Sequence, residues 1–296
     1  MGTSAYLAAV DDRVVVFDGA TGTWLQTQDL HADDYGGEQY EGCPELLAVT
    51  RPDVVAALHT AYFEVGADVV ETNTFGSLPG TLAEYGIAHR AQELSEANAR
   101  IAREVADSFS TPGQRRFVAG SMGPGTKSPS LGQISFAELR DGFEVQARGL
   151  LDGGVDLLII ETQFDLLAVK AAMIGARRAM AATGRDVPLQ VQVTIELTGR
   201  MLLGTEIGAA LTALDAMAPD VIGINCATGP SEMGEHIRHL SNFSRRPISV
   251  LPNAGLPSVV EGRMHYDLTA PELCEHHKRF VQELGVSIIG GCCGTT

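Results

Sequence analysis

Short, continuous apolar segments recur along the chain, separated by longer segments in which apolar residues fall at helical spacing. Continuous apolar runs of this kind are typical of parallel strands that helices cover on the outside. Eight such runs are found, at residues 14–17, 67–70, 117–119, 155–160, 189–195, 221–224, 248–251 and 286–289. The pattern therefore predicts eight parallel strands.

The segments between these runs predict the covering helices. After Pro52, for example, Val54, Val55, Leu58 and Tyr62 lie on one helical face. Further helices are expected at about residues 88–107, 136–151, 166–182, 207–217, 231–240 and 271–284. Eight strands that alternate with helices predict an α/β protein, built as a (β/α)8 or TIM barrel.

An open, doubly wound sheet is the alternative architecture. Such a sheet more usually has fewer strands, and no G-x-G-x-x-G turn follows the first strand here. No linker, low-complexity tract or block of like charges divides the sequence. Residues 1–296 are therefore expected to form one domain.

Polar and thiol side chains stand at the ends of the predicted strands. They are Asp18, Glu71, Asn73, Glu161, Cys226, Asn253, Cys292 and Cys293. In a TIM barrel the active site is built where the carboxyl ends of the parallel strands meet. These side chains are therefore expected to form a single site.

The cysteines at strand ends suggest a metal. Adjacent side chains on a strand point to opposite faces, so Cys292 and Cys293 can meet one centre only where the strand breaks, and the flanking glycines supply that break. With Cys226 they make three thiolates and leave one position open, which is typical of catalytic zinc. The alternative is that all three are small buried apolar residues.

The remaining cysteines and the histidines show no such setting. Cys43 lies in a loop that contains proline and Cys274 lies within a helix, so both are expected to be spectators. The histidines have no metal-binding spacing. The adjacent pair His276 and His277 is expected on a solvated helix face.

Two further strand ends suggest binding of a charged ligand. The turn at Gly19 and Ala20 can leave backbone N–H groups free to bind an anion. The carboxylate of Asp18 can accept a hydrogen bond from a cationic group. Glu161 ends a strongly apolar run, where an unpaired charge is costly, so a cation from a ligand would explain it. Asp18 as a turn former and Glu161 in a structural ion pair are the alternatives. An anion pocket beside an acidic pocket matches the two ends of an amino acid.

Composition narrows the function classes. The formal net charge of −16 and the pI near 4.8 disfavour nucleic acid and anionic membranes as partners. The chain start lacks the pattern of a signal peptide, and no apolar run approaches the ~20 residues that cross a bilayer. Five cysteines, two of them adjacent, do not resemble a disulfide framework. We expect a protein of the reducing cytoplasm.

The strand ends also carry a family resemblance. The segments DGATGT, ETNTF, NCATGP, PNAGLP and GGCCGTT, at residues 18–23, 71–75, 225–230, 252–257 and 290–296, resemble the homocysteine S-methyltransferase family. The resemblance runs from about Val14 to the last residue. With GSMGP at residues 120–124, the chain is most similar to the homocysteine-binding barrel of cobalamin-dependent methionine synthases.

The resemblance implies a function for each motif. Cys226, Cys292 and Cys293 would hold Zn²⁺, and the thiolate of L-homocysteine would take the fourth position, which Asn253 can fill when substrate is absent. Asp18 and Glu161 would meet the substrate ammonium, and the Gly19 and Ala20 amides would meet its carboxylate. The methyl group would come from methylcobalamin on another domain, and ultimately from methyltetrahydrofolate, giving methionine.

Two departures from the family pattern matter. Betaine-using relatives carry a tyrosine that can ligate zinc at the position of Gly76, which disfavours a betaine enzyme. Relatives also continue with a helix after the position of Thr296, so the last covering helix is expected to be missing. We therefore expect the N-terminal module of a longer protein, with cobalamin-binding and folate-binding domains as partners. A methyltransferase that uses a small donor such as S-methylmethionine, and a non-catalytic zinc or thiol sensor, are the alternatives.

Overall fold

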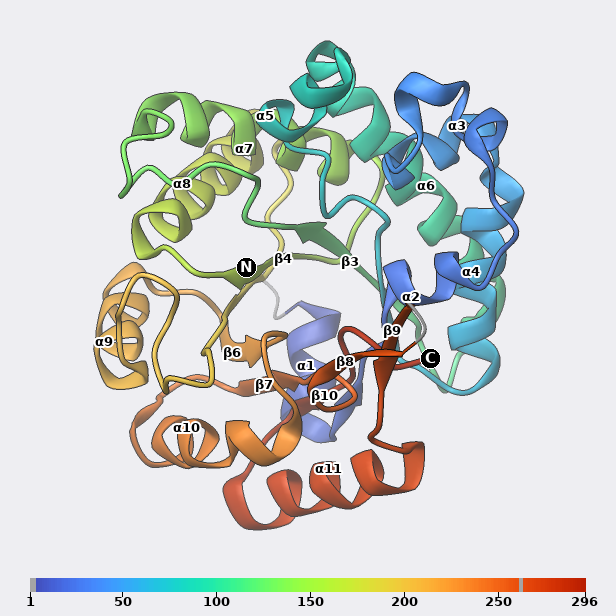
Figure 1. Ribbon diagram of the computed structural model, residues 1–296. Coiled ribbons are helices and arrows are strands. Elements are labelled where there is room, and N and C mark those ends of the chain that lie inside the picture. The colour runs from blue at the N-terminus through green and yellow to red at the C-terminus, as the bar shows by residue number, and fades with distance from the viewer. Residues whose placement is uncertain (1–3, 261–262) are drawn as a thin grey trace.

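The computed structural model describes residues 4–260 and 263–296 and contains the eight parallel strands that the sequence predicts (Figure 1). The order around the sheet is β1-β10-β7-β6-β5-β4-β3-β2, and a parallel bridge from Phe17 to Val69 joins the two ends. The strands are β1 (Val15–Val16), β2 (Val69–Glu71), β3 (Phe117–Met122), β4 (Leu157–Gln163), β5 (Leu189–Val193), β6 (Val221–Asn225), β7 (Ile248–Leu251) and β10 (Ile288–Ile289). The TIM barrel prediction is confirmed.

Helices surround the barrel as expected. The main ones are α4 (Pro52–Glu64), α6 (Ala91–Phe109), α7 (Phe136–Asp152), α8 (Leu166–Thr183), α9 (Ile207–Met217), α10 (Pro230–Phe243) and α11 (Ala270–Leu284). Shorter helices are α1 (Ala5–Asp12), α2 (Thr21–Gln26), α3 (Leu47–Thr50) and α5 (Pro79–Leu82), with 3-10 turns at residues 32–35, 38–40, 44–46, 83–85 and 88–90. None of the helices in the described residues is long and apolar enough to cross a membrane.

Helix α1 closes the bottom of the barrel, a feature that the strand pattern does not predict. The ring of Tyr6 meets Phe17 and Phe117 edge-on, and its hydroxyl donates to Gln190 Oε1 at 2.7 Å. Phe117 is the first residue of β3, so the plug lies at the amino ends of the strands. The opposite, carboxyl end stays available for the site.

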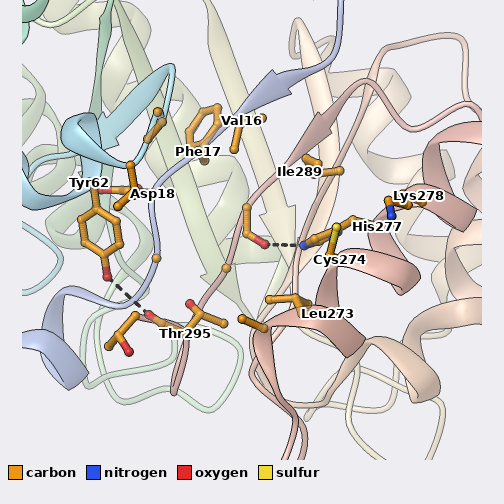
Figure 2. Close-up of a pocket in the computed structure, with 18 of the residues that line it drawn as sticks. Val16, Phe17, Asp18, Tyr62, Leu273, Cys274, His277, Lys278, Ile289 and Thr295 are labelled. Atoms are coloured by element: carbon orange, nitrogen blue, oxygen red, sulfur yellow. Dashed lines mark hydrogen bonds between the residues drawn. The ribbon is translucent and has the colours of Figure 1, made fainter.

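One outer sector of the barrel lacks a covering helix. Within the described residues, β10 leads directly into the segment 290–296, which we call the cysteine loop, and no helix follows. An apolar groove of about 690 Å³ remains between α4 and α11, and Val16, Leu273 and Ile289 are among its lining residues (Figure 2). This agrees with the expectation that the last covering helix is missing.

The structure also contains a small hairpin that the sequence pattern does not predict. Strands β8 (Pro257–Val260) and β9 (Arg263–Tyr266) pair antiparallel in the connection between β7 and α11. The connection leaves the carboxyl end of β7, so the hairpin belongs to the same rim as the cysteine loop.

Candidate functional site

The three predicted cysteines form a cluster at the carboxyl end of the barrel. The sulfurs of Cys226, Cys292 and Cys293 all lie within 4.8 Å of one another, and the Cys226 and Cys293 sulfurs are 3.8 Å apart. Zn–S bonds of about 2.3 Å in a tetrahedron place two sulfurs about 3.8 Å apart. The described residues contain no second group of this kind. The donor set and its spacing therefore fit zinc.

The charges of the three sulfurs also call for a cation. Hydrogen bonds from Cys226 and Cys292 lower the pKa of Cys293 to about 3, whereas the pKa of Cys292 is raised well above its usual range. Ionising all three would require a positive charge among them, which a metal ion provides.

The backbone around Cys226 is unusual. Cys226 and Ala227 have φ of 58° and 61°, in the left-handed region that residues other than glycine seldom adopt. The Cys226 amide donates to Leu251 O at 3.1 Å, and Cys226 O accepts from Thr228 N at 2.7 Å. The turn therefore begins directly after β6 and brings Cys226 to the rim.

The cysteine loop is tied to neighbouring strand ends. Gly291 N donates to Asp18 O at 3.0 Å, and Cys292 N donates to Pro252 O at 2.8 Å. Cys293 O accepts from Ala254 N at 2.9 Å. Chain segments after β1 and β7 thus fix the loop, which explains how two adjacent cysteines reach one centre.

Asn225 links the cysteine cluster to the end of β4, a role that the sequence did not reveal. Its Oδ1 accepts from Thr162 N at 2.8 Å, and its Nδ2 donates to Thr162 Oγ1 at 2.9 Å and to Glu161 Oε2 at 3.2 Å. Thr162 itself has a φ of 56°, at a shift of register between β4 and β5. The available signal in the sequence was an asparagine directly after an apolar run and directly before Cys226.

Glu161 is buried, as its position in an apolar strand predicted. Its Oε1 accepts from Ser121 Oγ at 2.6 Å. Burial raises the pKa of Glu161 to about 7, with the nearby Cys293 adding to the shift. No ion pair with a lysine or arginine is found for Glu161 in the described chain, so the structural ion pair considered as an alternative is not observed.

Two more carboxylates, those of Asp18 and Glu71, lie near Glu161. Asp18 is buried, and its Oδ2 accepts from Glu71 N at 2.9 Å. The Glu71 Oε1 atom is also buried, without a hydrogen-bond partner among the described residues. Burial raises the pKa of both Asp18 and Glu71 well above the usual range, and the charge of Glu161 adds to each shift. The region would therefore be stabilised by a cation.

These groups surround a cavity of about 390 Å³. Gly19, Ala20, Glu161 and the three cysteines line it, together with Glu45 and Glu71, and no lysine or arginine is among its described lining residues. Asp18 lies instead along the groove behind the cavity. Glu71 is thus a cavity residue that the sequence placed at the rim without assigning it a role.

The predicted anion site differs in detail. Ala20 N donates to Thr295 O at 2.8 Å, so this amide is already engaged, which differs from the expectation that it is open. The Gly19 amide has no acceptor among the described residues. Helix α2 begins at Thr21, and its N-cap residue supplies no side-chain hydrogen bond. The first amides of α2 are therefore available to an anion in the cavity.

Glu45 fills the space beside Gly76. Its Oε1 accepts from Gly76 N at 2.7 Å, and its Oε2 lies 3.5 Å from the Cys43 sulfur. A Cβ atom added to Gly76 would lie 2.5 Å from Glu45 Oε1. A side chain at residue 76 is thus incompatible with this placement of Glu45. Burial raises the pKa of Cys43 to about 12, and Cys43 lies outside the cluster of three cysteines.

Asn253 and the histidine pair complete the predicted residues. Asn253 lies between Pro252 and Ala254, whose backbones bond the cysteine loop, and its buried Oδ1 has no partner in the described part of the chain. An oxygen in this state suits a metal ligand. His277 is 8% exposed and hydrogen-bonded to Gly290, so the expectation that it is solvated is wrong.

Comparison with known proteins agrees with this geometry. The family model for homocysteine S-methyltransferase matches residues 15–296. Methionine synthases from Mycobacterium tuberculosis (strain ATCC 25618 / H37Rv) and Mycobacterium leprae (strain TN) are 53% and 52% identical over 290 residues. The match covers 98% of this chain and 24% of each relative. The metallated homocysteine methyltransferase MmuM from Escherichia coli has the same fold, with a TM-score of 0.75 and 22% identity over 98% of this chain and 95% of its own.

Proposed function

The chain belongs to the homocysteine S-methyltransferase family, and we propose that it transfers a methyl group to the sulfur of L-homocysteine to give methionine. The observation that carries this proposal is the three-sulfur cluster that opens onto a cavity with buried carboxylates. A thiol substrate with a cationic amine matches both features. The barrel would be the homocysteine-binding module of a longer methionine synthase.

Cys226, Cys292 and Cys293 would hold Zn²⁺, with the substrate sulfur in the fourth position. When bound, zinc would keep this sulfur in its thiolate form, which is the nucleophile. Asn253 is proposed to occupy the fourth position in the absence of substrate, which its unpartnered oxygen supports. The protein then needs no general base for the substrate thiol.

The amino-acid end of homocysteine would lie across the cavity. Glu161, held by Ser121 and Asn225, is proposed to accept a hydrogen bond from the ammonium. The ammonium would also favour the ionised forms of the neighbouring Asp18 and Glu71, whose pKa values are raised without it. The substrate carboxylate would lie at the Gly19–Ala20 turn, where the Gly19 amide and the first amides of α2 remain without acceptors among the described residues. These contacts would orient the sulfur toward the metal.

The methyl donor is proposed to be methylcobalamin on another domain, recharged from methyltetrahydrofolate. The support is that two relatives more than 50% identical to this chain are methionine synthases about four times as long. Cobalamin-binding and folate-binding domains of the same polypeptide would be its partners. The free thiols of the cluster suit the reducing cytoplasm, which is the proposed location.

The test combines coordination with proton counting. Zinc content should be one per chain, and homocysteine should raise the number of sulfur ligands from three to four by X-ray absorption. Binding should release about one proton near neutral pH, because the free thiol is mostly protonated there. Calorimetry in buffers of different ionisation enthalpy counts this proton. An unchanged three-sulfur shell with no proton release would refute the proposal.

The donor is tested separately. Methyl transfer to homocysteine by the zinc-loaded chain should proceed from free methylcobalamin and not from S-methylmethionine. The reverse preference would favour a small-donor methyltransferase. If zinc keeps four protein ligands when homocysteine is present, the result would favour a non-catalytic zinc module.

A further inference from the structure

Two covering helices contact the cysteine loop from the groove side. His277 on α11 lies with its Nε2 2.8 Å from Gly290 O, at the start of the loop. Tyr62 on α4 donates from its hydroxyl to Thr295 O at 3.3 Å, near the end of the loop (Figure 2). Cys292 and Cys293 therefore lie between two points that the helices hold.

The hydrogen bond of His277 has a defined direction. The Gly290 carbonyl can only accept, so Nε2 must carry the proton. Burial lowers the pKa of His277 to about 4, and the ring is therefore neutral at pH 7. Its Nδ1 has no partner in the described residues. The side chain is thus a buried neutral donor whose one hydrogen bond among the described residues is to the cysteine loop.

The peptide between Gly290 and Gly291 is held at both of its polar groups. Its carbonyl accepts from His277, and its N–H donates to Asp18 O at 3.0 Å. A Cβ atom on Gly290 would lie 2.7 Å from both Leu251 and Phe17 side chains, so this peptide is also closely packed. Fixing this plane sets the direction in which the chain enters Cys292.

We propose that His277 is a positioning residue that holds the cysteine loop in the conformation required for metal binding. It touches neither the metal nor the substrate, and it acts through the Gly290 carbonyl. The inference rests on the proposed zinc site. Helix α11, which belongs to the outer ring, would thus contribute to metal affinity.

The test compares variants that keep or remove the donor. His277→Leu removes the N–H group, whereas His277→Gln keeps one at a similar distance from the backbone. Cys274→Ala, on the same helix and groove wall, is the matched control because Cys274 lies outside the metal cluster. Zinc affinity is measured by competition with a chromophoric chelator, and the Co²⁺-loaded proteins are compared by their thiolate-to-metal absorption.

His277→Leu should weaken zinc binding about 10- to 100-fold, the range found when residues that orient metal ligands are replaced. The cobalt absorption should shift, and His277→Gln should restore both properties to near those of the unsubstituted chain. If the Leu variant does not fold, His277→Asn takes its place. The side chain of Asn is one carbon shorter than that of Gln, so its amide lies farther from the Gly290 carbonyl. Cys274→Ala should behave as the unsubstituted chain.

Equal zinc affinity and cobalt absorption with and without the His277 donor would overturn the positioning role and leave the proposed function intact. Equal losses in the Leu and Gln variants would also overturn it, because the side-chain volume and not the donor would then matter. An unsubstituted chain that binds no zinc would overturn both proposals.

Discussion

Replacing Glu161 by glutamine removes one charge from the cavity with little change in packing. The Ser121 hydroxyl can accept from the new amide, and the amide oxygen can still accept from Asn225 Nδ2, so both neighbours keep a partner. The substitution then weakens only the interaction between residue 161 and the ammonium of the ligand. A hydrogen bond to a charged group contributes about 1.5–3 kcal/mol, which predicts a Kd for homocysteine about 10- to 100-fold higher.

Calorimetry on the zinc-loaded variant measures this change. The matched ligand is 4-sulfanylbutanoic acid, which lacks the amine of homocysteine and should bind the variant and the unsubstituted chain equally. The matched variant is Asp165→Asn, because this buried carboxylate bonds Ser128 and Ser130 away from the cavity. Zinc content should stay unchanged in both variants.

Two results would refute the reasoning. Unchanged homocysteine affinity in Glu161→Gln would make Glu161 a structural residue. An equal loss of affinity for the ligand without an amine would mean that the substitution disturbs the sulfur or carboxylate end of the cavity and not an ammonium contact.

Three further predictions concern the metal, the core and acid stability. Cys226→Ser should abolish tight zinc binding in a chelator competition, whereas Cys43→Ser should not, because the buried Cys43 thiol lies outside the cluster. Gly149→Ala should lower the free energy of unfolding by about 1–3 kcal/mol in urea, because its Cβ would overlap a backbone oxygen of α6, whereas Gly234→Ala, with open space around it, should not lower it. Burial lowers the pKa of His59 to about 4 from 6.5, so this side chain binds more protons in the unfolded chain below pH 6.5 and by itself contributes a fall in stability of about 2 kcal/mol between pH 7 and pH 5. In urea unfolding at the two pH values, the change in stability from pH 7 to pH 5 in His59→Leu should therefore differ from that of the unsubstituted chain by this amount.

The barrel and the position of the cysteines could be predicted because they follow from local pattern and topology. An apolar run that ends in a cysteine predicts a strand end, and all parallel strand ends meet at one rim. Cys226 and Cys293, far apart in the sequence, are therefore brought together by the fold class alone. The burial of Glu161 followed from the same reasoning.

The rest depends on contacts between distant segments that have no local signature. The Ala20 amide bonds Thr295, and His277 bonds Gly290, only because the cysteine loop folds back against β1 and α11. Helix α1 precedes the first strand, where the alternation of strands and helices specifies nothing. Glu45 reaches the cavity from a long irregular connection whose course is set by packing.

The left-handed backbone at Thr162, Cys226 and Ala227 has a consequence for heat-resistant versions of this barrel. Residues other than glycine cost roughly 1–2 kcal/mol each in this region, and a whole domain has a net stability of only about 5–15 kcal/mol. A selection for thermal stability would therefore find one of its easiest gains at Ala227→Gly. Glycine would also free the turn that carries Cys226. Selection for heat resistance alone would thus loosen the turn that holds a proposed zinc ligand, so a thermostable barrel is better sought in the surrounding helices.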